Sequence, residues 1–227
     1  STGPAFEGIG IACGMMAAPG AVEEVELASR DAVPRVATVS GAPARGICGS
    51  GMIDLMAQLF ARGIIDRKGL LVPGAGSPRL AERGGRAAYV VRRKGEDGAA
   101  AEVYLTDVDL KKLLLTKAAI QAAIRTLLLE TGLGAADIAR VVIAGRLGEA
   151  LDAANAIAIG MLPDLPPGRF SYAGNGSLWG ANLLLLSRPA REEILGLADR
   201  VTYLDLSTHP SYMEQFVASL FIPHTDA

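Results

Sequence analysis

The chain has 227 residues and a mass of 23.5 kDa; half of its residues are hydrophobic and a fifth are charged, which excludes a disordered chain and a coiled coil. A net charge of −2 and a pI near 5.8 argue against a dedicated nucleic-acid binder, and no apolar run reaches the roughly 20 residues that span a bilayer. Two cysteines, Cys13 and Cys48, are too few for a disulfide framework, a four-cysteine zinc site or an iron–sulfur cluster, so we expect a cytoplasmic protein that contacts neither nucleic acid nor membrane.

The first part of the chain begins with Ser1-Thr2-Gly3-Pro4 instead of methionine, so we expect it to come from the inside of a longer protein. Residues 22–27 alternate apolar and acidic side chains and residues 35–40 are rich in β-branched residues, which predicts two strands. Apolar residues then recur at helical spacing from Ile53 to Phe60, and Gly63 is a helix stop.

Residues 66–101 are the most polar and irregular part of the chain. Strand candidates at 87–92 and 102–105 flank a Gly-Glu-Asp-Gly turn, which is typical of a hairpin. We therefore predict a hairpin-bearing insertion at 66–101 in a core formed by residues 1–65 and 102–227.

The rest of the chain alternates between helix and strand patterns. The longest predicted helix covers residues 107–131, with Thr106 as N-cap and Gly132 as its stop. Then follow a buried strand at 140–145, a helix near 152–160, a strand at 169–173, an apolar helix near 177–187, a helix opened by Pro189, a strand-like segment at 201–206 and a last helix at 209–220. This alternation predicts a βαβ core with a parallel sheet, and the early strands make the fold a mixed α/β (α+β) one.

Three glycine-rich turns, each between a predicted strand and a helix, are the candidate ligand-binding features. They are residues 46–51 (turn 1), 144–149 (turn 2) and 173–181 (turn 3). Glycines let backbone N–H groups converge on an anion, and the helix N-terminus adds a favourable dipole. Because open α/β sheets bind ligands at the carboxyl ends of their strands, the three turns together predict an edge that approaches a phosphorylated ligand.

Each turn also has an ordinary structural interpretation. Turn 1 matches a plain strand-to-helix connection in which Ser50 caps the helix instead of touching a phosphate. In turn 2, Arg146 can either cover a nucleotide or be a solvated loop residue. In turn 3, Asn175 or Ser177 can cap the helix, while Gly180 admits a closely packed neighbour.

Lys117 shares the apolar stripe of the longest predicted helix, because it follows Leu113 by four residues and precedes Ile120 by three. Lysine is almost never fully buried without a partner. Either the stripe lines a cleft at Lys117, or the side chain extends along the apolar surface until its ammonium reaches solvent. The two histidines do not form a nucleophilic triad, and we expect capping or packing from His209. The carboxylates near turns, such as Asp54 and Asp152, lack the spacing of a metal site.

Several motifs, in order along nearly the whole chain, resemble the C-terminal region of reductive activators of corrinoid proteins (RACo-like). They are residues 3–8, 13–15, 18–21, 47–55, 115–120, 141–145, 151–152, 159–163, 174–175, 180–181 and 206–210. The resemblance implies the acetate and sugar kinase, heat-shock chaperone and actin-like superfamily (ASKHA), with an actin-like ATPase or ribonuclease H-like core in which helices flank a mixed sheet.

The resemblance also implies a function. Such activators couple ATP and Mg to reduction of cob(II)alamin to cob(I)alamin on a partner corrinoid protein, with an electron from an iron–sulfur domain that this chain does not contain. The partners implied are ATP, the corrinoid protein and a second copy of the chain. Because the first aspartate-glycine-threonine phosphate loop of the superfamily is missing, we expect the chain alone to bind ATP weakly and to lack ATPase activity.

By motif position, the resemblance places a nucleotide site on nine residues: Gly49, Ser50, Gly51, Lys117, Gly145, Arg146, Gly148, Gly174 and Asn175. Lys117 and turn 2 would lie toward the adenosine, and turn 1 near the phosphates or the hinge. Related sequences tend to have a second glycine where this one has Arg146, which can crowd a purine or stack on it. Two alternatives therefore stay open: a docking module with a degenerate nucleotide site, and half of a small-molecule kinase.

Overall fold

The computed structural model describes residues 3–225, apart from the side chains of Arg146 and Glu149. Its strands are β1 (Ala21–Glu26), β2 (Arg35–Thr38), β3 (Gly46–Ile47), β4 (Leu80–Arg83), β5 (Arg86–Arg92), β6 (Val103–Thr106), β7 (Val141–Ile143) and β8 (Phe170–Tyr172). Its α-helices are α1 (Gly49–Ala61), α2 (Asp107–Thr131), α3 (Arg146–Glu149), α4 (Ala153–Ala158), α5 (Gly176–Leu186), α6 (Arg188–Ala198) and α7 (Tyr212–Ala218).

The strands form three small sheets, so the mixed α+β prediction is confirmed. The first has the order β2-β1-β3, with β1 antiparallel to β2 and parallel to β3. The second, β4-β5-β6, is antiparallel, and the third is the parallel pair β7-β8. Among the described residues, the predicted βαβ arrangement is therefore present at β7 and β8 alone, and the segment with α3 and α4 connects these two strands.

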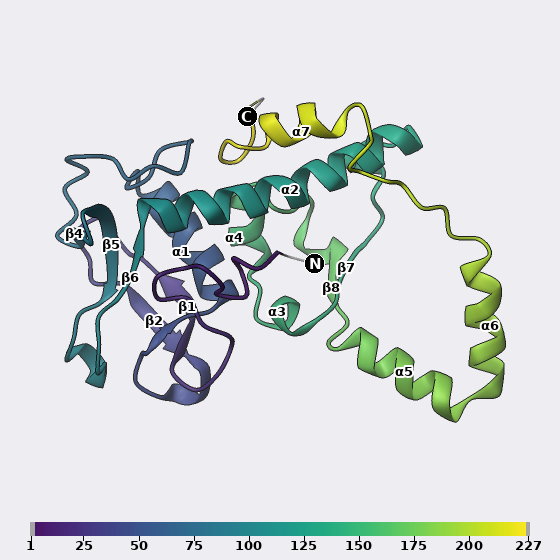
Figure 1. The fold of residues 1–227 in the computed structure, drawn as a ribbon, viewed down its shortest axis with the longest axis horizontal. Helices are drawn as coiled ribbons and strands as arrows, with labels where there is room; N and C mark the ends of the chain where they lie inside the picture. The colour runs from purple at the N-terminus through teal and green to yellow at the C-terminus, as the bar shows by residue number, and fades with distance from the viewer. Residues whose placement is uncertain (1–2, 226–227) are drawn as a thin grey trace.

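The two central helices form where the sequence places their signals. Thr106 caps α2 in a reciprocal capping box with Asp109, and Gly132 ends it in the left-handed conformation at φ 65°. Helix α1 buries an apolar set against β1, comprising Met52, Ile53, Leu55, Met56 and Leu59. Figure 1 shows α2 running along the molecule with α7 beside it.

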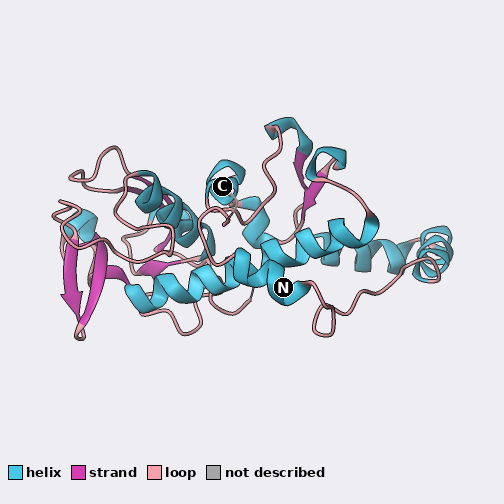
Figure 2. Cartoon of the chain, turned by 90° about the horizontal axis from the view of Figure 1, so that it is seen from above, coloured by secondary structure: helices cyan, strands magenta, loops and turns pink. Residues whose placement is uncertain are grey.

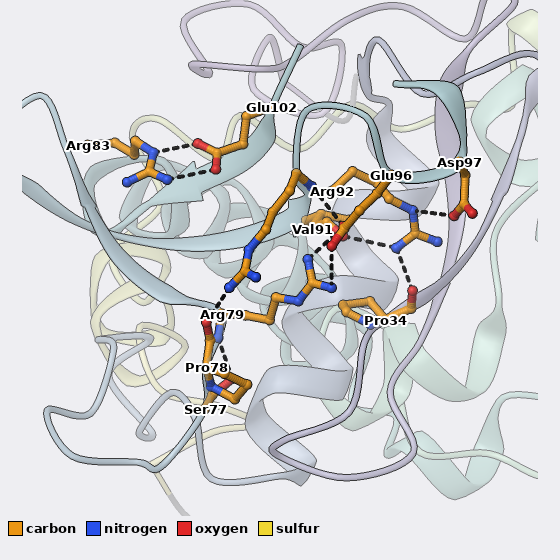
Figure 3. Close-up of polar contacts among 11 residues, drawn as sticks. Pro34, Ser77, Pro78, Arg79, Arg83, Val91, Arg92, Glu96, Asp97 and Glu102 are labelled. Carbon is orange, nitrogen blue, oxygen red and sulfur yellow. Dashed lines mark hydrogen bonds and ion pairs between the residues drawn. The ribbon is translucent and has the colours of Figure 1, made fainter. Parts of the chain in front are cut away.

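Two buried arginines form ion pairs with acidic residues of the loop between β5 and β6. The buried Arg79 guanidinium makes a two-pronged contact with Glu96, with Nη1–Oε2 at 2.8 Å and Nη2–Oε1 at 3.0 Å. Arg92, also buried, lies 3.1 Å from Asp97 through its Nε (Figure 3). Tyr89 and Val91 of β5 belong to the same hydrophobic core as β1 and α1, so the segment we predicted as an insertion packs into the main core.

The C-terminal third is less buried than the sequence predicts. Val142 in β7 is 55% exposed, although residues 140–145 read as a buried strand, because β7 pairs only with β8 in the described structure. None of the residues of α5 is buried, and Trp179 is 75% exposed. Helices α5 and α6 extend away from the body, at the end opposite the β4-β6 sheet (Figures 1 and 2).

Two element predictions near the C-terminus are wrong. Residues 201–206 do not form a strand, because no described strand lies beside them to pair with their backbone, and Tyr203 is 84% exposed. The last helix is shorter than 209–220 and begins at Tyr212. His209 instead organises the turn before it, accepting a hydrogen bond at Nδ1 from the Ser211 N–H (3.3 Å), with its Nε2 2.8 Å from Glu130.

Candidate functional site

Turn 1 is a tightly packed junction. A Cβ at Gly51 would collide with the Val22 carbonyl of β1, and a Cβ at Gly49 would collide with the Phe6 carbonyl. Only glycine therefore allows α1 to approach β1 and the N-terminal loop this closely. The predicted cap is wrong: α1 is preceded by Cys48, and Ser50 lies buried inside the first turn.

Turns 2 and 3 are joined by a backbone hydrogen bond. The Gly145 N–H donates to the Gly174 carbonyl at 2.7 Å, and the Gly176 N–H donates to the same oxygen at 2.9 Å. Gly145 has φ 101° and ψ 163°, a conformation that essentially only glycine adopts. An added Cβ at Gly145 would meet nothing within 4 Å, so the turn faces open space.

Turn 3 continues directly into α5. Asn175 caps this helix by accepting the Leu178 N–H at 3.1 Å, which confirms one of the two predicted caps. An added Cβ at Gly180 would also meet nothing within 4 Å, so the predicted close neighbour is not found in the described structure.

Helix α3, which forms the second half of turn 2, packs against turn 1. The Leu147 Cδ1 of α3 lies 2.9 Å from the position of a Cβ on Gly49, so the missing side chain of Gly49 makes room for it. Gly148 packs against β7, where a Cβ would approach the Ile143 Cγ2 to 2.6 Å. All three glycine turns thus meet around α3. The Arg146 side chain lies outside the described part of the structure.

A cavity of about 680 Å³ opens between α1, α4 and the β1-β2 edge, next to the loop that joins α3 to α4. Its charged lining is mostly acidic and comprises Glu24, Glu26, Asp54 and Asp152, with Arg35 as the basic residue. Asp54 is only 5% exposed and accepts two hydrogen bonds, from the Val25 N–H (3.2 Å) and from the Asn155 side chain (2.8 Å). Burial raises the pKa of Asp54 to about 6, and the two hydrogen bonds oppose that rise.

Lys117 is fully buried, which excludes the second of the two alternatives, in which its ammonium reaches solvent. Its Nζ donates to Gln121 Oε1 (2.8 Å) and to the carbonyls of Ser219 (2.9 Å), Phe221 (2.8 Å) and Pro223 (2.7 Å). Burial lowers the pKa of Lys117 to about 7, whereas the four oxygens, which share the three N–H donors of the ammonium, favour the protonated form. Lys117 thus attaches the C-terminal segment to α2, and a nucleotide would have to displace one of these oxygens to contact it.

The structure therefore brings together the glycines and Asn175 of the predicted site and gives Lys117 a separate role. Whether any of the nine residues binds a nucleotide stays a prediction. Asn155 and its hydrogen bond to Asp54 were not predicted from the sequence. The available signal was the position of Asp54 inside the apolar stripe of α1, which is the same argument that drew attention to Lys117.

A family model and two curated relatives place the chain in the same family. The model for the "C-terminal domain of RACo the ASKHA domain" matches residues 1–227. The chain is 30% identical over 222 residues to "Corrinoid activation enzyme RamQ" of Eubacterium limosum, covering 95% of this chain and 37% of that protein. It is 25% identical to "[Co(II) methylated amine-specific corrinoid protein] reductase" of Methanosarcina barkeri, covering 97% of this chain and 41% of that protein.

A solved structure supports the same assignment. The chain superposes on "Reductive activator for corrinoid,iron-sulfur protein" with a TM-score of 0.93 and 44% identity, over 100% of this chain and 36% of that one. The chain spans about two fifths of the length of the curated relatives it matches. No described helix is both long and apolar enough to cross a membrane. With motifs, fold and a full-length family match in agreement, this chain belongs to the family of C-terminal ASKHA domains of reductive activators for corrinoid proteins.

Proposed function

We propose that the chain is the ATP-responsive part of an activator that supports reduction of cob(II)alamin to cob(I)alamin on a partner corrinoid protein. The observation that carries the proposal is the convergence of the three glycine turns around α3, through the Gly145–Gly174 hydrogen bond and the Leu147–Gly49 approach. The names of the relatives support the corrinoid partner, since they are described as corrinoid activators and a corrinoid protein reductase.

The residues at turns 2 and 3 fit a nucleotide. Gly145 occupies a backbone conformation open only to glycine, and the space beside it is free. Glycine adopts this conformation without strain and is the usual residue where a backbone approaches a ligand closely. The nucleotide would occupy the open space beside Gly145, because the N–H groups of Gly145 and Gly176 already donate to the Gly174 carbonyl. ATP with Mg would supply the free energy of hydrolysis.

The chain's own contribution to the reaction is conformational. Nucleotide binding can shift the equilibrium between two conformations of the protein only if the nucleotide binds one of them more tightly than the other. Closure around the nucleotide would change the affinity for the corrinoid protein, and this coupling would drive an otherwise unfavourable one-electron transfer. The electron would come from an iron–sulfur domain outside this chain.

A reduction assay tests the proposal. The protein is expressed at its full encoded length and mixed with its corrinoid protein and an electron donor, and the cob(II)alamin absorbance is followed with and without ATP. We expect ATP-dependent loss of the cob(II)alamin band. Equal rates with and without ATP would contradict the proposal.

The variant Arg146→Gly separates this function from pure docking. If the wild-type protein hydrolyses ATP and the variant does so at least as fast, turn 2 is a working nucleotide turn. If neither protein hydrolyses ATP while both bind the corrinoid protein, the docking alternative holds. The kinase alternative draws no support from the relatives, which are described as corrinoid activators.

A further inference from the structure

A buried carboxylate links three elements beneath the glycine turns. Asp54 lies in α1, its Oδ2 accepts the backbone N–H of Val25 in β1, and its Oδ1 accepts a side-chain N–H of Asn155 in α4. Both carboxylate oxygens are therefore occupied by donors from different elements. A hydrogen bond to a charged group contributes more than a neutral one, and leaving it unmade in a buried place is costly.

The charges around Asp54 do not neutralise it. Glu24 of β1 and Asp152, the N-cap of α4, both raise its pKa. Glu26 of β1 and Arg35 of β2 also line the cavity, but they lie 3.4 Å apart as an ion pair of their own. Burying a carboxylate without an opposite charge beside it costs free energy. The two directed hydrogen bonds of Asp54 are the interactions that offset this cost.

Those bonds act on the segment that carries turn 2. Only residues 150–152 separate α3 from α4, and the Leu151 carbonyl accepts the hydroxyl of Tyr172 in β8 at 3.2 Å. The α3–α4 segment is thus held at three points: Leu147 against Gly49, Leu151 by Tyr172, and Asn155 by Asp54. The third point is the shorter of two hydrogen bonds between α4 and α1, the other being donated by Gln58 Nε2 of α1 to Asn155 Oδ1 at 3.5 Å.

We propose that Asp54 is a positioning residue for turn 2: by holding Asn155 it fixes α4 on α1 and so sets the place of Gly145 relative to turn 1. This inference rests on the proposed nucleotide site, because it assigns the distance between turns 1 and 2 a role in binding. Asp54 itself touches no ligand in this account.

The variant Asp54→Asn tests the hydrogen bond with almost no change in shape. Its amide presents one acceptor and one donor where the carboxylate presents two acceptors, so one side faces another donor in either orientation. The double variant Asp54→Asn/Asn155→Asp restores the contact between positions 54 and 155 in reverse, since the new amide at 54 donates to the new carboxylate at 155. It also removes the donation from Asn155 to Asp152 Oδ2 (3.4 Å) and places two carboxylates side by side, so the restoration is partial. Thr106→Ala is the matched control, because it removes the cap of α2 and lowers stability at a distant place.

The first readout is ATP affinity of the full-length protein by calorimetry. We expect Asp54→Asn to weaken ATP binding about ten- to a hundredfold, as loss of a charge-assisted hydrogen bond implies. The double variant should recover part of the loss, and Thr106→Ala should bind within about twofold of wild type. Equal weakening by the control, or no recovery in the double variant, would overturn the proposal.

The second readout needs no nucleotide. Hydrogen exchange of the free protein should rise in residues 146–158 in Asp54→Asn, stay unchanged in residues 86–92, and return in the double variant. If wild type binds no ATP, the proposed function fails, and the exchange pattern still decides whether Asp54 positions α3 and α4. A rise spread over the whole chain, or none, would refute the positioning role.

Discussion

Replacing Lys117 with methionine tests the hydrogen bonds that attach the C-terminal segment to α2. Methionine preserves the length and fills the buried volume, but it leaves the carbonyls of Ser219, Phe221 and Pro223 without their donor. A buried polar group without a partner costs about 1–3 kcal/mol, so three carbonyls give roughly 3–9 kcal/mol. Relief of the buried charge offsets part of this, as the pKa lowered to about 7 indicates. We expect a net loss of about 3 kcal/mol.

Chemical denaturation measures this loss, with Lys111→Met as the control because Lys111 is an exposed lysine on the same helix. The control should change the free energy of unfolding by less than about 0.5 kcal/mol. Hydrogen exchange should also accelerate in residues 219–225, which the lysine attaches to α2. If Lys117→Met is as stable as Lys111→Met, the four oxygens do not depend on the ammonium, and the assigned structural role is wrong.

Three further predictions address turn 1, the cap of α2 and the buried carboxylate. Gly51→Ala should lower the melting temperature sharply because its Cβ collides with the Val22 carbonyl, whereas Gly180→Ala, a helical position with open space, should be neutral or stabilising by about 0.5–1 kcal/mol. Thr106→Ala should cost about 1 kcal/mol in denaturant unfolding through loss of its cap, and an unchanged midpoint would argue against the capping box. Burial raises the pKa of Asp54 from 3.8 to about 6, so the native state binds more protons than the unfolded state between these two pH values. The free energy of unfolding of wild type, relative to that of Asp54→Asn, should therefore fall as the pH rises from 4 to 7. The expected fall is about 2 kcal/mol after discounting for solvent screening. A flat difference across that range would show that the carboxyl is not desolvated.

The sequence by itself determined the local structure wherever the signal is local. The capping pair Thr106 and Asp109 together with Gly132 defines α2 to the residue, and Asn175 is a correct cap for α5. These features depend on hydrogen bonds within one turn of helix, which the order of residues already specifies. The motif resemblance likewise identified the family, because it rests on short segments of sequence and not on their contacts.

The tertiary structure alone decided which distant residues meet. The sequence shows that Lys117 and Asp54 each lie in an apolar stripe. It does not show that Lys117 would donate to carbonyls about a hundred residues away, or that Asp54 would accept from an asparagine at a similar separation. It also predicted a strand at 201–206 and a buried strand at 140–145, because a β-branched pattern reports propensity while pairing depends on which strand lies alongside. Burial and pairing are properties of the packed whole, so the contacts that join the three glycine turns around α3 could be read only from the folded chain.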